Sequence, residues 1–243
     1  MRDPLLEEIA YARVYCAEFG GELGTFFTME VDKKQYLITA KHLAKKINFG
    51  PIGVEKMAFL PVFYNKKPSD LFVQLVGHVQ GDVDISVLAA TCLIDNSMPS
   101  IEPISTNIEY GEKNVFFFGF RCPKKTNPRI IKDERPPLPV IRKSTISYAS
   151  QKEHLFITEQ NNPGFSGSPV LMRNSDLSVN SKNDFYHVIG VMSEYKGAPI
   201  TTLDSEGHQV STADENSGTM AIHDIRPAVY MIKSNPIGFR LPY

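Results

Sequence analysis

The sequence has few cysteines, little net charge and no long apolar run, and each of these features excludes a class of protein. Three cysteines in 243 residues are too few, and odd in number, for the disulfide framework of a small secreted domain. The 26 lysines and arginines are balanced by 27 aspartates and glutamates, which disfavours an electrostatic nucleic-acid binder. No apolar stretch reaches the roughly 18 residues that a membrane-spanning helix requires.

Patterns for metal binding and for targeting are missing as well. No CxxC pair and no HExxH segment occurs, so we expect neither a metal ion nor another cofactor. The segment from Met1 to Glu8 contains acidic side chains and lacks the basic start and apolar core of a signal peptide. We therefore expect a cytoplasmic protein in a reducing compartment, without membrane attachment.

What is present is the composition of a folded protein with a β-rich pattern. Hydrophobic residues make up 42% of the chain and charged residues 22%, and the length suits one large domain or two small ones. Short β-branched and aromatic runs are separated by turn-forming pairs such as Gly20-Gly21 and Asp32-Lys33. This spacing predicts an all-β sandwich or barrel. The principal runs are 24–31, 35–39, 57–63, 71–76, 84–88, 115–120, 185–192 and 220–222.

Both ends of the chain depart from this β pattern. Asp3 can cap a helix that has Pro4 at its first position, and 226–232 has the pattern of a short terminal helix. Proline and serine cluster over 97–104, where we expect a linker between two β halves. We therefore divide the chain into residues 1–100 and residues 101–243.

The first of three motifs suited to chemistry is Asn162-Pro163-Gly164-Phe165-Ser166-Gly167-Ser168-Pro169-Val170. A serine between glycines, in a turn that leads into a strand, is placed as a nucleophile would be. The glycines let the backbone pass close to a substrate carbonyl. The amides of Gly164 and Ser166 can converge on one point and stabilise an oxyanion. The alternative interpretation is an ordinary Gly/Ser-rich turn.

The second motif, Tyr36-Leu37-Ile38-Thr39-Ala40-Lys41-His42-Leu43, is an apolar strand that ends by delivering a histidine. A serine hydroxyl is a weak nucleophile near neutral pH and needs a neighbouring base, most often histidine. His42 is our candidate for that base. The alternative is a surface histidine at the start of a helix.

The third motif, Gly81-Asp82-Val83-Asp84-Ile85-Ser86-Val87-Leu88, places a carboxylate before an apolar strand. Such a carboxylate can accept a hydrogen bond from the histidine ring and fix its tautomer. Asp82 is a rival for this role, but the apolar run after Asp84 favours Asp84. The alternatives are an ordinary turn or one arm of a calcium loop, for which the further oxygen ligands and the closing glutamate are missing.

Together the three motifs resemble the trypsin-like, chymotrypsin-fold serine proteases, nearest in style to bacterial heat-shock and cytoplasmic trypsin-like peptidases. Residues 39–42 match the strand end Thr-Ala-(Ala)-His of that family, and residues 84–88 match its Asp-Ile-Ala-Leu-Leu. Residues 162–169 match Asn-Pro-Gly-Asn-Ser-Gly-Gly-Pro with two changes. The resemblance extends from about Tyr11 to Ile232. It implies two six-stranded antiparallel β-barrels with a short N-terminal helix and a C-terminal helix.

The same resemblance implies the function of a serine endopeptidase that cleaves protein or peptide substrates through an acyl-enzyme. His42 would be the general base and acid, Asp84 would orient it, and Ser166 would attack the scissile carbonyl. The implied oxyanion hole consists of the Gly164 and Ser166 amides. The implied substrate-binding residues are Gln160 near the floor of the specificity pocket and the strand of Ser193, Glu194 and Tyr195, which would pair with the substrate backbone.

Two features leave alternatives open. Related digestive and clotting enzymes have an aspartate before the serine that captures a new N-terminal amine, and here that residue is Phe165. In one alternative, the Phe165 ring packs beneath the loop and holds the turn whose amides form the oxyanion hole. In the other, the ring leaves that turn badly formed, and the chain is an inactive protease-fold binding or scaffold protein. The basic residues over 122–143 offer a more distant nucleic-acid-binding alternative, although Asp133, Glu134 and several prolines interrupt them. For specificity we expect small or medium apolar residues before the cleaved bond. The sequence predicts no oligomeric state.

Overall fold

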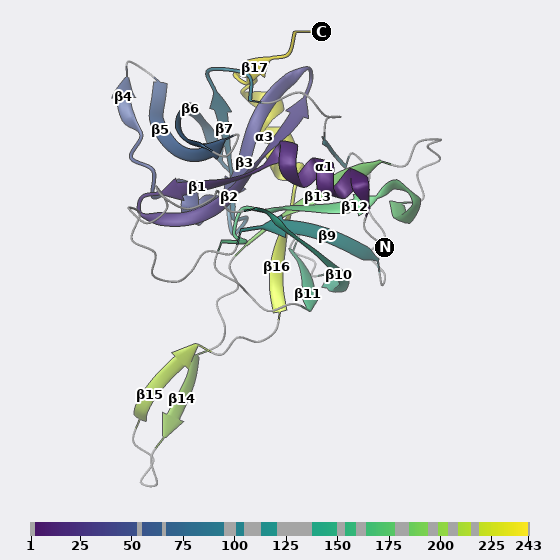
Figure 1. Ribbon diagram of the computed structural model, residues 1–243. Coiled ribbons are helices and arrows are strands. Elements are labelled where there is room, and N and C mark those ends of the chain that lie inside the picture. The colour runs from purple at the N-terminus through teal and green to yellow at the C-terminus, as the bar shows by residue number, and fades with distance from the viewer. Residues whose placement is uncertain are drawn as a thin grey trace.

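The structure is a computed structural model that describes residues 3–52, 55–64, 67–94, 101–104, 113–120, 138–149, 154–158, 164–177, 185–193, 199–203, 209–214 and 219–242. Within these ranges strands predominate and helices are short (Figure 1). The all-β class and the helix near each end are therefore confirmed.

The first sheet is built mainly from the N-terminal half of the chain. Its strands are β1 (Val14–Phe19), β2 (Glu22–Val31), β3 (Lys34–Ala40), β4 (Gly50–Ile52), β5 (Glu55–Tyr64), β6 (Lys67–His78), β7 (Ile85–Ala90) and β17 (Phe239–Arg240). The strand order is β1-β2-β3-β7-β6-β5-β4. An antiparallel pairing of β1 with β5 closes the six strands from β1 to β5 in that order into a barrel. β17, from the chain end, pairs with β3.

The second sheet contains strands from the remainder of the chain. They are β8 (Glu102–Pro103), β9 (Asn114–Gly119), β10 (Val140–Ala149), β11 (His154–Thr158), β12 (Pro169–Arg173), β13 (Tyr186–Met192) and β16 (Thr219–Asp224). The antiparallel order β12-β9-β10-β11-β16-β13 returns to its start through a pairing of β12 with β13. These pairings therefore also close a ring. β8 lies parallel to β13, so a short strand forms within the segment that we expected to be a linker.

Three α-helices, one 3-10 turn and a separate hairpin complete the described elements. The helical elements are α1 (Pro4–Arg13), α2 (Lys41–Ala44), η2 (Asn174–Leu177) and α3 (Arg226–Ser234). The hairpin consists of β14 (Pro199–Leu203) and β15 (Gln209–Asp214) and projects away from the two barrels in Figure 1. The division of the chain at about residue 100 stays a prediction.

The N-terminal helix begins as its sequence predicts and connects the two barrels. A side-chain oxygen of Asp3 accepts a hydrogen bond from the Leu5 amide at 3.1 Å, which satisfies a free donor of the first turn. The other oxygen accepts from Arg173 of β12 at 2.6 Å and from the Tyr186 hydroxyl of β13 at 2.7 Å. Since α1 continues directly into β1, this helix joins the second barrel to the first.

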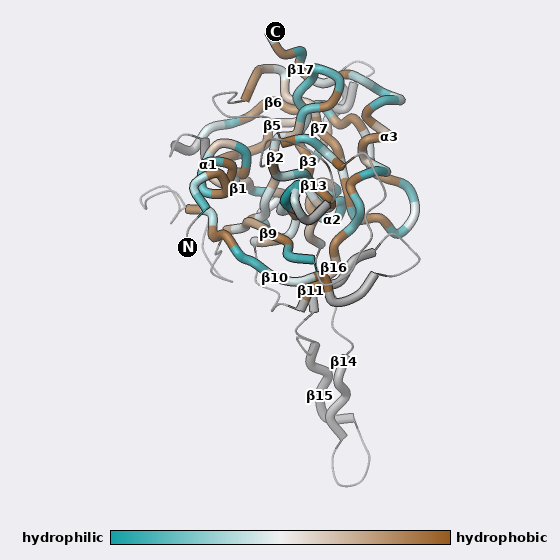
Figure 2. Tube along the Cα trace, turned by 90° about the vertical axis from the view of Figure 1, so that its right-hand side faces the viewer, coloured by the Kyte–Doolittle hydropathy of each residue, from teal (hydrophilic) through white to brown (hydrophobic). Residues whose placement is uncertain are grey.

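Strands β3 and β7, which lie next to each other in the first sheet, are buried on both faces. β3 and β7 are buried almost throughout. Leu37 and Leu88 belong to the core inside the first barrel, while Ile38 and Val87 belong to the larger core that continues into the second barrel. Burial on both faces explains why the apolar residues 36–38 and 87–90 follow one another without alternating with polar residues. Figure 2 shows the hydrophobic residues concentrated along the barrel strands.

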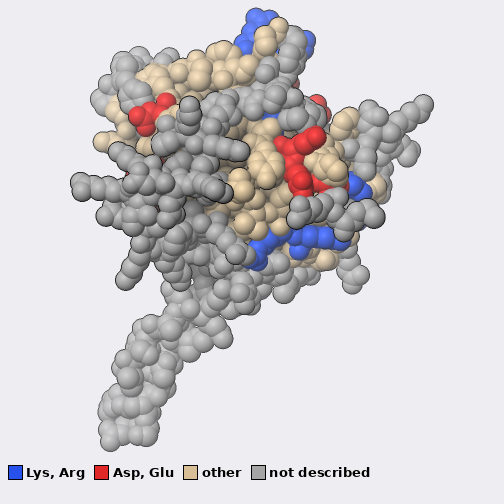
Figure 3. All heavy atoms as spheres, in the orientation of Figure 1, with Lys and Arg blue, Asp and Glu red and all other residues tan. Residues whose placement is uncertain are grey.

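On the face that Figure 3 presents, the described residues include both acidic and basic side chains. Among the described residues, no helix is long and apolar enough to cross a membrane.

Candidate active site

His42 and Asp84 come together because their strands pair. β3 and β7 are antiparallel, with Ala40 opposite Ile85. His42 comes two residues after Ala40 in α2, and Asp84 comes directly before Ile85. Both residues therefore lie at the same end of one strand pair, although 42 positions separate them in the chain.

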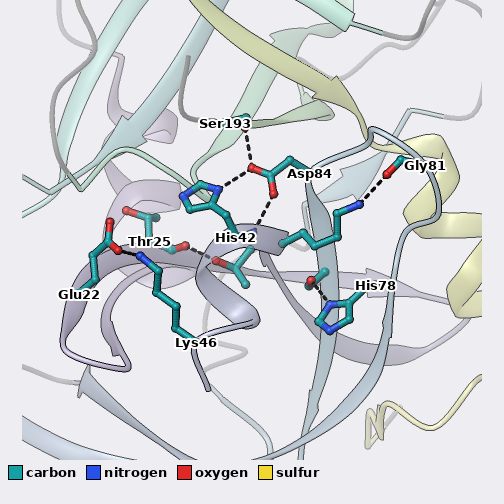
Figure 4. Close-up of polar contacts among 11 residues, drawn as sticks. Glu22, Thr25, His42, Lys46, His78, Gly81, Asp84 and Ser193 are labelled. Carbon is teal, nitrogen blue, oxygen red and sulfur yellow. Dashed lines mark hydrogen bonds and ion pairs between the residues drawn. The ribbon is translucent and has the colours of Figure 1, made fainter. Parts of the chain in front are cut away.

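The Asp84 carboxylate holds His42 through two contacts (Figure 4). Oδ2 of Asp84 lies 2.6 Å from Nδ1 of the histidine ring, and Oδ1 accepts from the His42 backbone amide at 2.8 Å. The ring therefore has a fixed orientation, and Nδ1 is the nitrogen that carries a proton toward the carboxylate. Asp82, the rival carboxylate, is exposed to solvent.

A serine from the second barrel completes the surroundings of Asp84. The buried Ser193 side chain donates a hydrogen bond from Oγ to Oδ2 of Asp84 at 2.6 Å (Figure 4). The sequence indicated Ser193 only as a residue that pairs with the substrate backbone, and that role stays a prediction. No local pattern indicates the contact with Asp84, because the two residues are 109 positions apart.

These donors control the ionisation of Asp84. Burial alone raises the pKa of this carboxyl, but the hydrogen bond and charge of the His42 ring, together with the Ser193 hydroxyl, lower it, and the net pKa lies below its ordinary value of 3.8. Asp84 is therefore ionised at neutral pH, as a group that stabilises an adjacent imidazolium must be.

Lys41 holds the turn that precedes Asp84. Its ammonium donates to the carbonyls of Val79 and Gly81 at 3.0 and 2.9 Å, and its backbone amide donates to the Asp84 carbonyl at 3.2 Å. The sequence offered no reason to assign this role to Lys41. The structure thus adds a residue that positions Asp84 from the histidine side.

The loop that contains Ser166 is tied to the first barrel through Thr25 of β2. The Thr25 amide donates to the Ser166 carbonyl at 3.0 Å, and the Thr25 hydroxyl donates to the Gly164 carbonyl at 2.6 Å. In turn, the Thr39 hydroxyl donates to the Thr25 carbonyl at 2.7 Å. This buried chain of hydrogen bonds connects the serine loop to the strand that ends next to His42.

Gly167 shows how closely the loop approaches that strand. Its φ is +86°, a conformation that glycine adopts at little cost. A Cβ atom at this position would overlap the Thr25 carbonyl oxygen, lie 2.5 Å from the Thr39 hydroxyl and lie 3.1 Å from the Ala40 amide nitrogen. The Gly167 amide donates to the Met192 carbonyl at 2.9 Å. The loop therefore fits between the two barrels only with glycine at position 167.

Ser166 is close to the His42 strand but is not hydrogen-bonded to the ring. Nε2 of His42 is buried and has no hydrogen-bond partner among the described residues. A catalytic serine and its histidine base need to come within hydrogen-bond reach, and this contact is absent between the two side chains here. In unliganded enzymes such contacts are often long and tighten when substrate binds.

Three of the sequence-predicted substrate-binding residues cannot be placed. Gln160, Glu194 and Tyr195 lie outside the described residues. Gly164 is described, with a φ of +93°, and its amide remains the predicted partner of the Ser166 amide in an oxyanion hole. In the described part of the chain, no group of three or more His, Cys, Asp or Glu side chains is arranged to hold a metal ion.

Comparison with known proteins gives matches in structure only. No family model and no curated protein matches the sequence. A serine endoprotease from Yersinia pestis superposes with a TM-score of 0.55 at 15% identity, over 96% of this chain and 67% of that one. The Rv3671c protease of M. tuberculosis in an inactive form gives 0.54 at 14% identity, over 96% of both chains.

A further match is the HtrA-type protease AlgW with a tripeptide, which gives a TM-score of 0.52 at 17% identity, over 93% of this chain and 61% of that one. At such identities the likeness concerns the fold, and it agrees with the closed antiparallel barrel derived above. The chain therefore has the chymotrypsin-like fold of the trypsin-like serine proteases.

Proposed function

We propose that this chain is a serine endopeptidase with His42, Asp84 and Ser166 as its catalytic triad. The observation that supports this most strongly is the His42–Asp84 pair. Nδ1 of His42 is bound by the ionised Asp84 carboxylate, and Nε2 of His42 has no partner among the described residues. A histidine held in this way can accept a proton at Nε2. Ser166 lies on the loop that is tied to the adjacent strand end.

In the proposed reaction, Ser166 Oγ attacks the carbonyl carbon of a peptide bond while its proton passes to Nε2 of His42. The tetrahedral intermediate collapses, the C–N bond breaks, and Nε2 returns the proton to the leaving amine. Water then repeats the sequence on the acyl-enzyme and releases the carboxylic acid. Throughout, Asp84 stabilises the imidazolium without itself taking the proton.

The amides of Gly164 and Ser166 are the proposed donors to the oxyanion. The carbonyls of both residues are held by hydrogen bonds from Thr25, which supports a fixed arrangement of the loop before substrate arrives. Such preorganised donors stabilise the charge that develops in the transition state.

The proposed substrates are proteins or peptides in extended conformation, which would pair with the segment from Ser193 to Tyr195 and place a side chain near Gln160. The expectation of small or medium apolar side chains before the cleaved bond is part of this proposal. We further propose the reducing cytoplasm as the compartment, since Cys16 and Cys92 are free thiols.

Labelling with a fluorophosphonate probe tests the proposal, because the probe reacts only with an activated serine. The unaltered protein should be labelled at a single site. Ser166→Ala should not be labelled, and Ser168→Ala, which removes the next serine in the same loop, should retain labelling. Mass spectrometry of the labelled peptide identifies the modified residue.

Absence of labelling in the unaltered protein would favour the alternative, an inactive protease-fold binding or scaffold protein. Labelling of Ser166→Ala equal to that of the unaltered protein would also remove the enzyme proposal. For the nucleic-acid alternative, salt-dependent binding to DNA that survives neutralisation of Lys124, Lys125 and Arg129 would exclude the basic segment as the binding site.

A further inference from the structure

Phe165, the residue before the proposed nucleophile, is buried between strands of the second barrel. Its side chain is 1% exposed. Its ring meets the ring of Phe117 edge to face, with centroids 5.9 Å apart and an interplanar angle of 69°, an arrangement that aromatic pairs favour. The loop is therefore anchored in the barrel by a large apolar side chain at the position next to Ser166.

The floor beneath this ring is Gly119, at the end of β9. A Cβ atom on Gly119 would lie 2.5 Å from Cγ and from Cδ1 of Phe165. The φ of Gly119 is not in the left-handed region. Glycine is therefore needed at this position for space and not for backbone conformation. The absent side chain is what allows the Phe165 ring to reach the strand.

Arg142 of β10 also contacts the Phe165 ring. The guanidinium carbon lies 5.4 Å from the centroid of Phe165, within the range of a cation–π contact. Arg142 stands opposite Phe117 in the pairing of β9 with β10. Because Phe117 and Arg142 are paired across the two strands, the Phe117 ring and the Arg142 guanidinium both contact Phe165.

The backbone on both sides of Phe165 is fixed as well. The Gly164 carbonyl accepts from the Phe120 amide at 3.4 Å, and the Phe165 carbonyl accepts from the Ser168 amide at 3.0 Å. The Ser166 carbonyl is held by Thr25. With its backbone held before and after the ring, the peptide from 164 to 166 has little freedom to rotate unless the ring leaves its place.

We propose that Phe165 is the positioning residue of the oxyanion hole, and that Gly119 and Arg142 hold its ring in place. This inference rests on the proposed peptidase function. The ring holds the Gly164 and Ser166 amides in the arrangement that binds the oxyanion. The residues that hold the ring, Phe117, Gly119 and Arg142, all belong to strands of the folded barrel. The loop therefore reaches this arrangement without a new chain terminus or any prior cleavage.

The test compares Gly119→Ala and Phe165→Leu with Phe118→Leu as a matched control. Phe118 is equally buried in β9, and it alternates with Phe117 and Gly119 along the strand, so that its side chain lies on the other face. In the first two variants we expect kcat on a peptide substrate to fall on the order of 100-fold with KM unchanged, since small misplacements of catalytic groups cost about this much. The fluorophosphonate labelling rate should fall in parallel, and Phe118→Leu should retain both.

Two further variants separate positioning from general loss of stability. In the double variant Gly119→Ala with Phe165→Leu, the smaller side chain makes room for the added methyl group. The two effects on kcat should therefore be less than additive. Arg142→Met should lower kcat several-fold, and Arg142→Lys should restore most of it. If Phe165→Leu alone fails to fold, the double variant and the two Arg142 variants still test the proposal.

The outcomes distinguish the inference from the function on which it rests. If the unaltered, uncleaved protein is not labelled, both the peptidase function and the role of Phe165 are overturned. If it is labelled and Gly119→Ala and Phe165→Leu react at the unaltered rate, only the role of Phe165 is overturned. A loss in Phe118→Leu as large as that in Gly119→Ala would likewise overturn it, since the effect would then follow from loss of core packing.

Discussion

The two ends of the proposed triad are held in place by different kinds of interaction. On the first barrel, His42 and Asp84 are fixed by side-chain hydrogen bonds of 2.6 and 2.8 Å that involve a charged carboxylate. On the second, Ser166 is fixed by backbone hydrogen bonds, by glycine at position 167 and by the buried ring of Phe165.

This difference indicates how each end can fail. The His42–Asp84 end depends on charge, so removing a charge or a donor should disturb it without unfolding the barrel. The Ser166 end depends on close steric fit, so adding a single methyl group should disturb it.

Loss of the Asp84 charge should have the largest effect. Asp84→Asn keeps the shape of the side chain but cannot stabilise the imidazolium or hold its tautomer. We expect kcat/KM to fall on the order of 10⁴-fold, measured with a peptide substrate. Asp82→Asn is the matched control and should leave activity unchanged, because Asp82 is exposed and is not the carboxylate that binds His42. Equal losses in both variants would contradict the assignment.

Addition of a methyl group at Gly167 should disturb the serine end sterically. In Gly167→Ala, the new Cβ would overlap the Thr25 carbonyl, so the loop must move. We expect the fluorophosphonate labelling rate to fall on the order of 100-fold and the free energy of unfolding to fall by about 1–3 kcal/mol from backbone strain alone.

Gly21→Ala provides the control for that strain. Gly21 has a similar φ of +90°, and nothing lies within 4 Å of a Cβ atom there. This variant should lose stability through strain while it labels at the unaltered rate. If Gly21→Ala lost labelling as much as Gly167→Ala, the steric explanation for the serine end would be wrong.

Removal of the Ser193 hydroxyl should weaken the charged end without abolishing it. In Ser193→Ala, Asp84 loses one of the donors that lower its pKa, so that pKa rises. Activity at neutral pH, measured as kcat/KM with a peptide substrate, should fall about tenfold, as expected for one hydrogen bond to a charged group. Ser193→Thr keeps the hydroxyl and should restore most of the activity. An unchanged kcat/KM in Ser193→Ala would contradict this role.

The smallest effect should come from Asp3, which joins α1 to the second barrel. Burial raises the pKa of Asp3, but hydrogen bonds from Tyr186 and the Leu6 amide, with the charge of Arg173, lower it below its ordinary value of 3.8. The carboxylate therefore stabilises the fold above that value, and the contribution is lost as the pH falls through the folded-state pKa.

Asp3→Asn keeps a capping side chain and removes the charge. Urea unfolding should show the variant modestly less stable than the unaltered protein at pH 7, and the difference should disappear at pH values below the pKa. A difference that persisted at low pH would show that Asp3 acts through its shape and not through its charge.

Much of the first barrel could be anticipated from local patterns. Asp3 and Pro4 predicted the start of α1, and the turn at Asp32 and Lys33, where φ is +49° and +60°, joins β2 and β3 as a two-residue hairpin. The preference for Asp84 over Asp82 followed from the apolar run that begins at Ile85. These features depend on neighbours in the chain, and neighbours can be read directly from the sequence.

Contacts between segments far apart in the chain could not be anticipated. Ser193 as a donor to Asp84, Thr25 as the anchor of the serine loop and Lys41 as the support of the Asp84 turn all follow from strand pairing and barrel packing. The space that Gly119 leaves for Phe165 is a further example, since a glycine at a strand end has several explanations until its neighbours are known.

The sequence alone therefore determined the β-rich class, the helix near each end and the three motifs in the order His42, Asp84, Ser166, because periodicity, turn residues and short motifs are local properties. Only the tertiary structure decided which side chains meet those motifs: Ser193 on Asp84, Thr25 on the serine loop, Gly119 and Arg142 on Phe165. The physical reason is that hydrogen bonding and close packing depend on distance in space, and the closure of the barrels brings together residues that no local pattern connects.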